Sequence, residues 1–181
     1  MIAIPDTMPT LPALKHLGDL ADRRPTVIID TREQAPLLFT RLPAIRAGLL
    51  TGDYSIRGLE NLFAIERKSI PDLVSCCCAS NRERFENELH RLRGYRFKRL
   101  LIVGTVKEIT EGAYRSQIKP SCVLGSLAAW EVRYDVPVEW QPTPEAAARR
   151  VEGWAWYFAR EIVEGCNGLL RGSVATAATA G

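Results

Sequence analysis

Short apolar runs bounded by turn-forming residues predict the strands of this chain. Thr26–Asp30 is a β-branched run that ends on an acid, which is typical of a buried strand. Two further runs are separated by the turn-type spacer Gly58-Leu59-Glu60-Asn61, which indicates an antiparallel hairpin. The runs of this hairpin are Tyr54–Arg57 and Leu62–Lys68, and later strands are predicted at Arg99–Val103 and Val136–Trp140.

Apolar residues at helical spacing predict four helices. Ser69-Ile70-Pro71-Asp72 is a helix start in which Ser69 caps and Asp72 bonds back to it. Thr143-Pro144-Glu145 is another, and its helix is expected to run to about Val163. The remaining two helices are expected over Arg82–Gly94, with Phe85, Leu89 and Leu92 on one side, and from Pro120, with Val123, Leu127, Trp130 and Tyr134.

The remaining segments are irregular. Residues 34–51 mix leucines with Pro36, Pro43 and Gly48, and only a short turn of helix is expected there, at Pro43–Ala47. Residues 165–181 are small and of low complexity, which predicts a loose tail. The expected organisation is an N-terminal arm (1–24), one domain (25–164) and this tail (165–181).

Composition is consistent with one domain that has a real core. The chain has 181 residues, of which 46% are hydrophobic, and a net charge of +3. It begins with no signal-peptide pattern and contains no apolar stretch of about 18 residues, so a soluble cytoplasmic protein without membrane contact is expected. Its five cysteines are odd in number and form no C-x-x-C pair, which argues against a zinc site or a disulfide framework.

Positive charge gathers in the middle of the chain. Between Ile65 and Leu100 there are nine basic and five acidic residues. This net charge of +4 exceeds the net charge of +3 of the whole chain. A phosphate-binding face would have this pattern. A solvated helix would as well, since Arg82/Glu86 and Arg84/Glu88 are i,i+4 pairs.

The predicted hairpin carries the candidate chemistry. It brings Asp53 beside Glu66, and strand alternation places Glu66 and Lys68 on one face. Two carboxylates and a lysine suit metal-assisted phosphodiester hydrolysis, in which hard oxygen ligands hold Mg²⁺ or Mn²⁺ and the lysine orients water or steadies the developing anion.

Each of these residues also has a structural interpretation. Acid–lysine clusters at strand ends are often surface ion pairs that contribute about 0–1 kcal/mol. Asp72 fits a helix cap as well as it fits catalysis, and Asp30 fits a turn or cap after its strand.

The order of these motifs resembles the XPF/Hef family of structure-specific DNA nucleases. Asp30-x-Arg32-Glu33 follows a strand, Gly52-Asp53 follows next, and Glu66-Arg67-Lys68 with Asp72 completes the signature. The resemblance covers about residues 25–163 and includes Asn81-Arg82-Glu83-Arg84-Phe85 and Arg99–Val103. The segment Ser121-x-Val-Leu-Gly-Ser-Leu resembles the corresponding segment of stand-alone bacterial or phage members of the family.

The resemblance implies a restriction-endonuclease-like α/β fold, a three-layer α/β/α arrangement with a central mixed β-sheet. It also implies a metal-dependent endonuclease that cuts flaps, forks or junctions, a role in DNA repair or recombination, and a nucleoid-associated location in a bacterium or phage. Expected metal ligands are Asp53, Glu66 and Asp30, holding Mg²⁺ or Mn²⁺. The expected catalytic set is Asp30, Asp53, Glu66, Arg67, Lys68 and Asp72, and the expected DNA-binding set is Arg32, Glu33, Arg82, Arg84 and Arg91.

Two further expectations concern partners and activity. The second apolar side of the last helix, around Ala155, Trp156 and Ala159, suits a homodimer, and a separate DNA-binding partner is the other possibility. The competing functional hypothesis is a catalytically weak or inactive nuclease fold kept as a DNA-binding or dimerisation scaffold. A third is an α/β domain with no nucleic-acid role, in which the hairpin acids form ion pairs.

Overall fold

The computed structural model describes the backbone of residues 24–178 and the side chains of residues 24–171. The expected N-terminal arm lies outside the described residues, apart from Arg24. The chain divides into two compact units. Arg24–Ala159 forms one of them, and the end of the last helix, from Arg160, belongs to the other.

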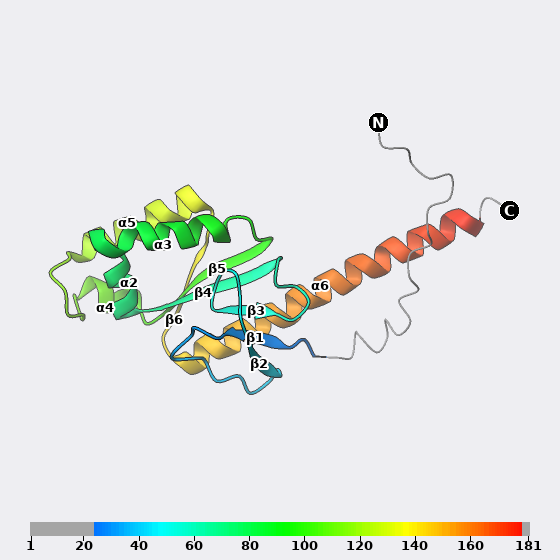
Figure 1. Ribbon diagram of the computed structural model, residues 1–181, viewed down its shortest axis with the longest axis horizontal. Coiled ribbons are helices and arrows are strands. Elements are labelled where there is room, and N and C mark those ends of the chain that lie inside the picture. Colours follow the sequence, from blue (N-terminus) through cyan, green and yellow to red (C-terminus); the bar gives the residue numbers. More distant parts are fainter. Residues whose placement is uncertain (1–23, 179–181) are drawn as a thin grey trace. The chain divides into compact units, whose positions relative to one another are not determined.

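A six-stranded mixed sheet forms the centre of the Arg24–Ala159 unit (Figure 1). The strand order is β2-β1-β3-β4-β5-β6, in which β3 is antiparallel to both of its neighbours and the other pairs are parallel. The predicted hairpin is confirmed as β3 and β4, with Tyr54 opposite Ile65. The strands are β1 Val27–Asp30, β2 Ala44–Ala47, β3 Tyr54–Ile56, β4 Phe63–Ser69, β5 Phe97–Val103 and β6 Val138–Gln141.

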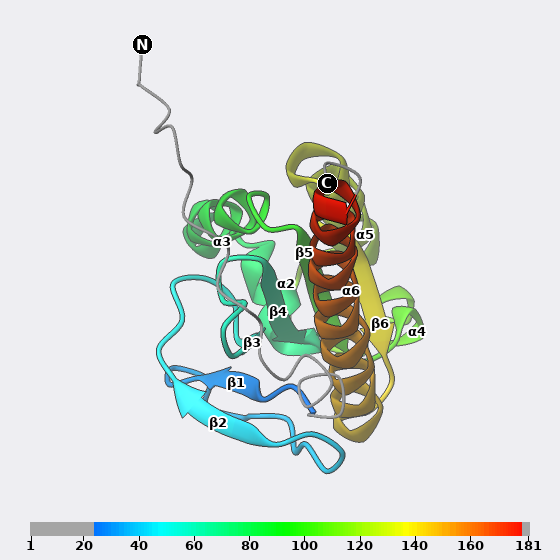
Figure 2. The ribbon, with the colours of Figure 1, turned by 90° about the vertical axis from the view of Figure 1, so that its right-hand side faces the viewer.

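Helices lie on both faces of this sheet, which confirms the predicted α/β class and its central mixed sheet (Figure 2). Ser69 caps α2, as predicted, and Pro120 and Pro144 occupy first-turn positions of α5 and α6. The helix predicted from Arg82 begins three residues earlier. The helices are α2 Ile70–Cys76, α3 Ala79–Leu92, α4 Val106–Thr110, α5 Pro120–Tyr134 and α6 Pro144–Ala178.

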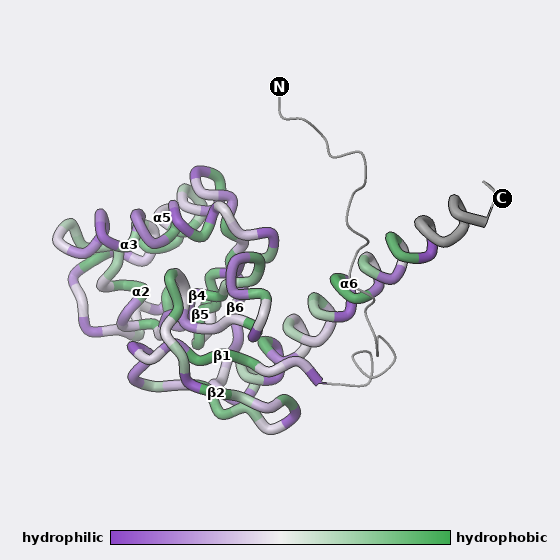
Figure 3. Tube along the Cα trace, turned by 45° about the vertical axis from the view of Figure 1, so that its right-hand side comes forward, coloured by the Kyte–Doolittle hydropathy of each residue, from purple (hydrophilic) through white to green (hydrophobic). Residues whose placement is uncertain are grey.

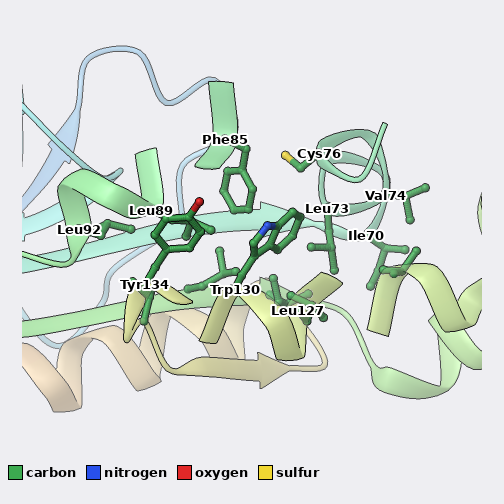
Figure 4. Close-up of a cluster of buried hydrophobic side chains, with 14 of the residues drawn as sticks. Ile70, Leu73, Val74, Cys76, Phe85, Leu89, Leu92, Leu127, Trp130 and Tyr134 are labelled. Atoms are coloured by element: carbon green, nitrogen blue, oxygen red, sulfur yellow. The ribbon is translucent and has the colours of Figure 1, made fainter. Parts of the chain in front are cut away.

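One face of the sheet packs against α2, α3 and α5 (Figure 4). Ala64, Leu100 and Ile102 contribute this face of β4 and β5. Phe85 of α3 meets Trp130 of α5 edge to face, with ring centroids 5.0 Å apart. Figure 3 shows hydrophilic and hydrophobic positions alternating along α3 and α5, the pattern of helices with one buried side.

The opposite face packs against the first part of α6. Phe63 of β4 stacks on Phe97 of β5 at 4.7 Å, and Phe158 lies 5.4 Å from Phe63. Trp154 lies 5.7 Å from Phe97. Because side chains alternate along a strand, Phe63 lies on one face and Ala64 on the other, and one strand serves both layers.

The prediction of a helical turn at Pro43–Ala47 is wrong, because these residues include β2. Val27 pairs with Ala44 in a parallel register, and the Val27 N–H donates to the Pro43 carbonyl at 2.9 Å. Three of the four β2 residues are exposed, as befits an edge strand. An exposed edge strand carries no hydrophobic period, so only its pairing with β1 identifies it.

The last helix is longer than predicted. It continues past Val163 to Ala178, so residues 165–178, predicted to be a loose tail, are helical. Alanine favours helix and no proline interrupts this stretch, so its glycines reduce helix propensity without ending the helix.

Gly52 lies where β3 approaches β4, and no other residue type fits there. Its φ is +80°, and a Cβ atom would lie 2.9 Å from the Ile65 carbonyl oxygen. The next residue, Asp53, donates its N–H to that same oxygen at 2.8 Å. Gly52 therefore allows the close approach that sets Asp53 beside β4.

We expect Gly52→Ala to lower the free energy of unfolding by about 2–3 kcal/mol, because it combines positive-φ strain with a backbone clash. Gly58→Ala is the matched control: Gly58 has φ +84° with no atom near its would-be Cβ, so it should cost only about 1–2 kcal/mol. Urea unfolding of both variants measures the difference. Equal losses would show that the contact with Ile65 is unimportant.

Candidate active site

Three of the predicted acids lie on three neighbouring strands or directly beside them: Asp30 ends β1, Asp53 precedes β3 and Glu66 lies in β4. The Asp30 N–H donates to the Asp53 carbonyl at 2.8 Å, and the Asp53 N–H donates to the Ile65 carbonyl at 2.8 Å. Asp30, Asp53 and Glu66 therefore follow one another across β1, β3 and β4. The backbone brings the predicted carboxylates to one edge of the sheet.

A cavity of about 320 Å³ opens beside these strand ends. Most of the predicted site residues line it, but Asp30, Glu66, Arg82 and Arg91 are not among its lining residues. The lining residues are Arg32, Glu33, Gln34, Ala35, Asp53, Arg67, Lys68, Asp72, Ser75, Cys76 and Arg84.

Glu66 and Lys68 form an ion pair at the inner side of this site. Only 5% of Glu66 is exposed. The Lys68 Nζ also lies 3.7 Å from the Glu88 Oε2 of α3 and 5.2 Å from the centre of the Phe85 ring. Burial lowers the pKa of Lys68, but the two carboxylates outweigh this and raise it, so the lysine remains charged. The alternation argument for Glu66 and Lys68 is confirmed.

The acidic pair of the site resists ionisation. Burial raises the pKa of Asp53, and the N–H of Arg67, 2.7 Å from Oδ2, offsets this only in part. Burial, with the nearby Asp53 charge, also raises the pKa of Glu66, although Lys68 acts in the opposite direction. Two buried carboxylates near each other make this a place where a bound cation would be favourable.

Asp30 is engaged in a different set of contacts. Its Oδ1 accepts from the backbone N–H and Nε of Arg32 at 2.8 and 2.7 Å, and its Oδ2 accepts from the Leu49 N–H at 2.6 Å. Burial raises the pKa of Asp30, but the hydrogen bonds from Arg32 and Leu49 outweigh it and hold the pKa below its usual value. These contacts support the turn interpretation of Asp30.

Arg67 and Glu33 form a second ion pair, which lines the cavity. The Nε and Nη2 of Arg67 donate to the two oxygens of Glu33 at 3.1 and 3.0 Å, and the Ala35 N–H adds a third donor at 2.7 Å. Strand alternation directs Arg67 away from Glu66, as predicted, and toward Glu33. Glu33 is only 7% exposed, and both of its carboxylate oxygens are bound by Arg67.

Asp72 takes part in the cap of α2 and also lines the cavity. Its N–H donates to the Ser69 hydroxyl at 3.3 Å, and that hydroxyl donates to the Asp72 Oδ2 at 2.6 Å, which is a reciprocal cap of α2. The same side chain lines the cavity.

The three arginines predicted on α3 lie in different surroundings. Arg84 is exposed and lines the cavity. Arg82 donates to Glu86 and to the Ser126 hydroxyl and lies over the Trp130 ring, so it joins α3 to α5. Arg91 is exposed and outside the cavity lining.

The donor set fits a divalent cation of the magnesium type. Such ions are usually held by one or two carboxylates, with waters and substrate phosphate completing the shell. Asp53 and Glu66 provide two carboxylates on adjacent strands, whereas the Asp30 oxygens are occupied by Arg32 and Leu49. Within residues 24–171, no group of three or more His, Cys, Asp or Glu side chains is placed to hold a metal ion.

Most of the chain matches one protein family. A family profile described as the ERCC4 domain matches residues 29–152, which is most of the chain and includes the whole cluster of acids. The chain belongs to the ERCC4 domain family. This confirms the resemblance to XPF-type nuclease domains. A comparison with curated proteins gives no match.

Solved structures show the same fold. The ERCC4 domain described here is similar to XPF from Aeropyrum pernix, with a TM-score of 0.58 and 20% identity over 72% of this chain and 60% of that one. A second structure of XPF from Aeropyrum pernix, in complex with DNA, has the same TM-score and identity over 76% and 66%. The chain thus spans about 60–66% of the XPF chains that it matches.

Sequence reasoning missed two residues of this ERCC4 domain site. The sequence indicates Glu88 only as an i,i+4 partner of Arg84, whereas in the structure it lies near Lys68. Cys76, one of the cysteines outside any C-x-x-C pair, lines the cavity, and burial raises the pKa of its thiol. The spacing Phe85-x-x-Glu88 is a usable signal, since it places Glu88 one turn after a core residue and close to the sheet.

Metal-free stability is expected to fall as the pH rises. Burial raises the pKa of Asp53 to about 6 and that of Glu66 to about 8, from ordinary values of 3.8 and 4.5. The folded state therefore holds protons that the unfolded chain has released, and this contribution to stability is lost between about pH 4 and 8. Melting temperatures from pH 4.5 to 8.5, without metal, measure it.

Glu66→Gln is the comparison for this experiment. In this variant the melting temperature should fall less steeply as the pH rises. Mg²⁺ should raise the melting temperature of the wild type more at pH 8 than at pH 5, because the carboxylates that bind the ion must be deprotonated. Identical pH profiles for wild type and Glu66→Gln would contradict the assigned burial effect.

None of the helices within residues 24–178 combines the length and apolarity that a membrane span requires.

Proposed function

We propose that this ERCC4 domain is a divalent-metal-dependent endonuclease that hydrolyses phosphodiesters in branched DNA, such as flaps, forks or junctions. The observation that carries the proposal is the pair of carboxylates, Asp53 and Glu66, beside a charged lysine at a cavity that three arginines also line. Membership of the ERCC4 domain family supports it. A role in DNA repair or recombination follows by analogy with the family.

The ionisable side chains of the site have proposed parts in the reaction. Asp53 and Glu66 would hold Mg²⁺ or Mn²⁺, which when bound neutralises phosphate charge and acidifies water. Lys68, held charged between Glu66 and Glu88, would donate a hydrogen bond to the phosphate or to the attacking water. Arg67 is fixed by Glu33 and adds positive charge at the wall. Asp30 positions Arg32 and the Leu49 backbone rather than binding the ion.

DNA contact is proposed for the exposed arginines of this region. Arg32 keeps 70% of its side chain exposed despite its bond to Asp30, and Arg84 lines the same cavity. Arg91 is an exposed arginine further along α3. Arg82 is held by Glu86 and Ser126, so its proposed part is structural. Guanidinium groups suit phosphate because their fork of donors matches its oxygens.

The decisive experiment is a panel of labelled DNAs incubated with Mg²⁺ or Mn²⁺. Flap, fork and four-way substrates should be cut, linear duplex should be cut more slowly, and chelation should stop the reaction. DNA binding without cleavage of any substrate would instead favour the scaffold hypothesis. If the protein neither binds nor cuts any of these DNAs, the hypothesis of a domain with no nucleic-acid role is favoured.

We also propose that the domain acts on DNA as a homodimer or together with a separate DNA-binding protein, as the resemblance implies. Sedimentation of the protein alone and with a flap substrate tests this. One protein chain per DNA at saturation, with full activity, would contradict it.

Asp72→Ala is expected to lower the free energy of unfolding by about 1 kcal/mol, because it removes a cap of α2. Because Asp72 also lines the cavity, cleavage should fall by more than this loss explains. Ser69→Ala is the matched control, since Ser69 belongs to the same cap and lies outside the cavity lining. Equal cleavage by the two variants would assign Asp72 to capping alone.

A further inference from the structure

A second cavity, of about 380 Å³, shares no lining residue with the first. It lies where the loop before β2 meets α6, within the Arg24–Ala159 unit. Its walls combine a buried carboxylate, two arginines and two aromatic rings. These are Glu152, Arg24, Arg41, Trp156 and Tyr157, with Leu42.

The Glu152 carboxylate is held in place but only half satisfied. Its Oε1 accepts from three successive backbone N–H groups, those of Thr40, Arg41 and Leu42, at 2.9, 2.6 and 3.1 Å. The residue is 3% exposed, and its Oε2 is a buried polar atom without a hydrogen-bond partner in the described part of the chain. Buried acceptors are nearly always paired, so this oxygen offers a place for a ligand N–H.

The rest of the cavity adds positive charge and a flat ring. The Arg24 Nη1 donates to the Arg41 carbonyl at 3.0 Å, which holds two guanidinium-bearing residues at the cavity. Tyr157 is 67% exposed. The Trp156 ring meets it edge to face, with centroids 5.0 Å apart, and so supports the orientation of the tyrosine ring.

We propose that this cavity binds one unpaired nucleotide of the DNA substrate. The base stacks on Tyr157 and donates an N–H to the Glu152 Oε2, and its phosphate pairs with Arg24 and Arg41. A simple anion would meet the Glu152 charge, and a cationic peptide would meet two arginines. A nucleotide matches both, because it carries a donor-bearing ring at one end and a phosphate at the other.

This inference rests on the proposed nuclease function only for the origin of the nucleotide, which would be a single-stranded arm of a branched substrate. Titration calorimetry with the full chain tests the site itself. The probes are deoxyguanosine monophosphate, deoxyribose 5-phosphate and inorganic phosphate, followed by a single-stranded octanucleotide and a duplex of the same sequence. We expect the nucleotide to bind about tenfold more tightly than deoxyribose 5-phosphate, and the single strand more tightly than the duplex.

Variants separate stacking from charge. Tyr157→Ala should weaken nucleotide binding about tenfold or more, whereas Tyr157→Phe, which keeps the ring, should change it less than about twofold. Arg41→Gln should weaken every phosphate-bearing probe, while Arg149→Gln, an exposed arginine of α6 outside the cavity, should not. Glu152→Gln should weaken the nucleotide but not deoxyribose 5-phosphate. If it fails to fold, the Tyr157 pair still decides.

Several results would overturn the inference. One is equal affinity for the nucleotide and for deoxyribose 5-phosphate. Another is nucleotide affinity that Tyr157→Ala leaves unchanged. A third is a wild type that binds no nucleotide, together with a Tyr157→Ala variant whose sedimentation coefficient differs from that of the wild type. The last result would assign the surface to a second copy of the chain. Nucleotide binding that persists in Glu66→Gln, or in a wild type that cuts no DNA, supports this site whatever becomes of the nuclease proposal.

Discussion

Glu66→Gln is expected to reduce DNA cleavage by at least about 100-fold, since changing even the outer partners of metal ligands costs about 10–100-fold. The side chain keeps its size, so the fold should persist. What is lost is the negative charge that faces Lys68 and, in the proposed reaction, one of two ion ligands. Single-turnover cleavage of a flap substrate in saturating Mg²⁺ measures the effect.

Glu83→Gln is the control, because Glu83 is an exposed carboxylate of α3 that lies outside the cavity lining. It should cleave at the wild-type rate. A Glu66→Gln variant that keeps both its melting temperature and its cleavage rate would remove the carboxylate pair from the mechanism. Loss of cleavage with unchanged DNA affinity is the result that the proposal requires.

Arg67→Met is expected to lower the free energy of unfolding by about 3–5 kcal/mol, because it leaves the Glu33 charge buried without its partner. The Arg67 and Glu33 side chains are only 12% and 5% exposed. Adding Glu33→Gln should recover most of this loss, since the amide oxygen can still accept from the Ala35 N–H. Urea unfolding of the two single variants and the double variant measures the coupling.

The same variants decide whether Arg67 acts in catalysis or in positioning. Restored stability with cleavage still lost in the double variant would assign Arg67 a direct role in the reaction. Restored stability with restored cleavage would make it structural. Arg57→Met, at an exposed position after β3, is the control and should change stability by no more than about 0.5 kcal/mol. A large effect there would mean that arginine removal as such is destabilising.

The family and its motif could be predicted from the sequence because both depend on local order. Gly52-Asp53 and Glu66-Arg67-Lys68 lie in a short hairpin, and strand alternation alone pairs Glu66 with Lys68. The helix starts at Ser69, Pro120 and Pro144 could also be predicted, since the residue preferences at a helix start involve only a few neighbouring residues. These signals established the α/β class and the position of the acids.

Contacts between distant segments decided the rest. The strand β2 has mostly exposed residues and exists because β1 pairs with it, which no hydrophobic period reveals. Asp30 is the last residue of β1, and Glu33 follows it closely. Only the folded chain shows that Asp30 is bound by Arg32 and the Leu49 N–H, whereas Glu33 meets Arg67 from 34 residues away.

The sequence by itself therefore determined the family, the hairpin and the residues from which a site can be built. The tertiary structure decided which of those side chains bind one another and which face a cavity, as with Glu88 beside Lys68 and with Glu152 and Tyr157 in the second cavity. The physical reason is the distance along the chain over which each interaction acts. Backbone periodicity and capping act over a few residues, whereas burial and ion pairing depend on neighbours that only folding brings together.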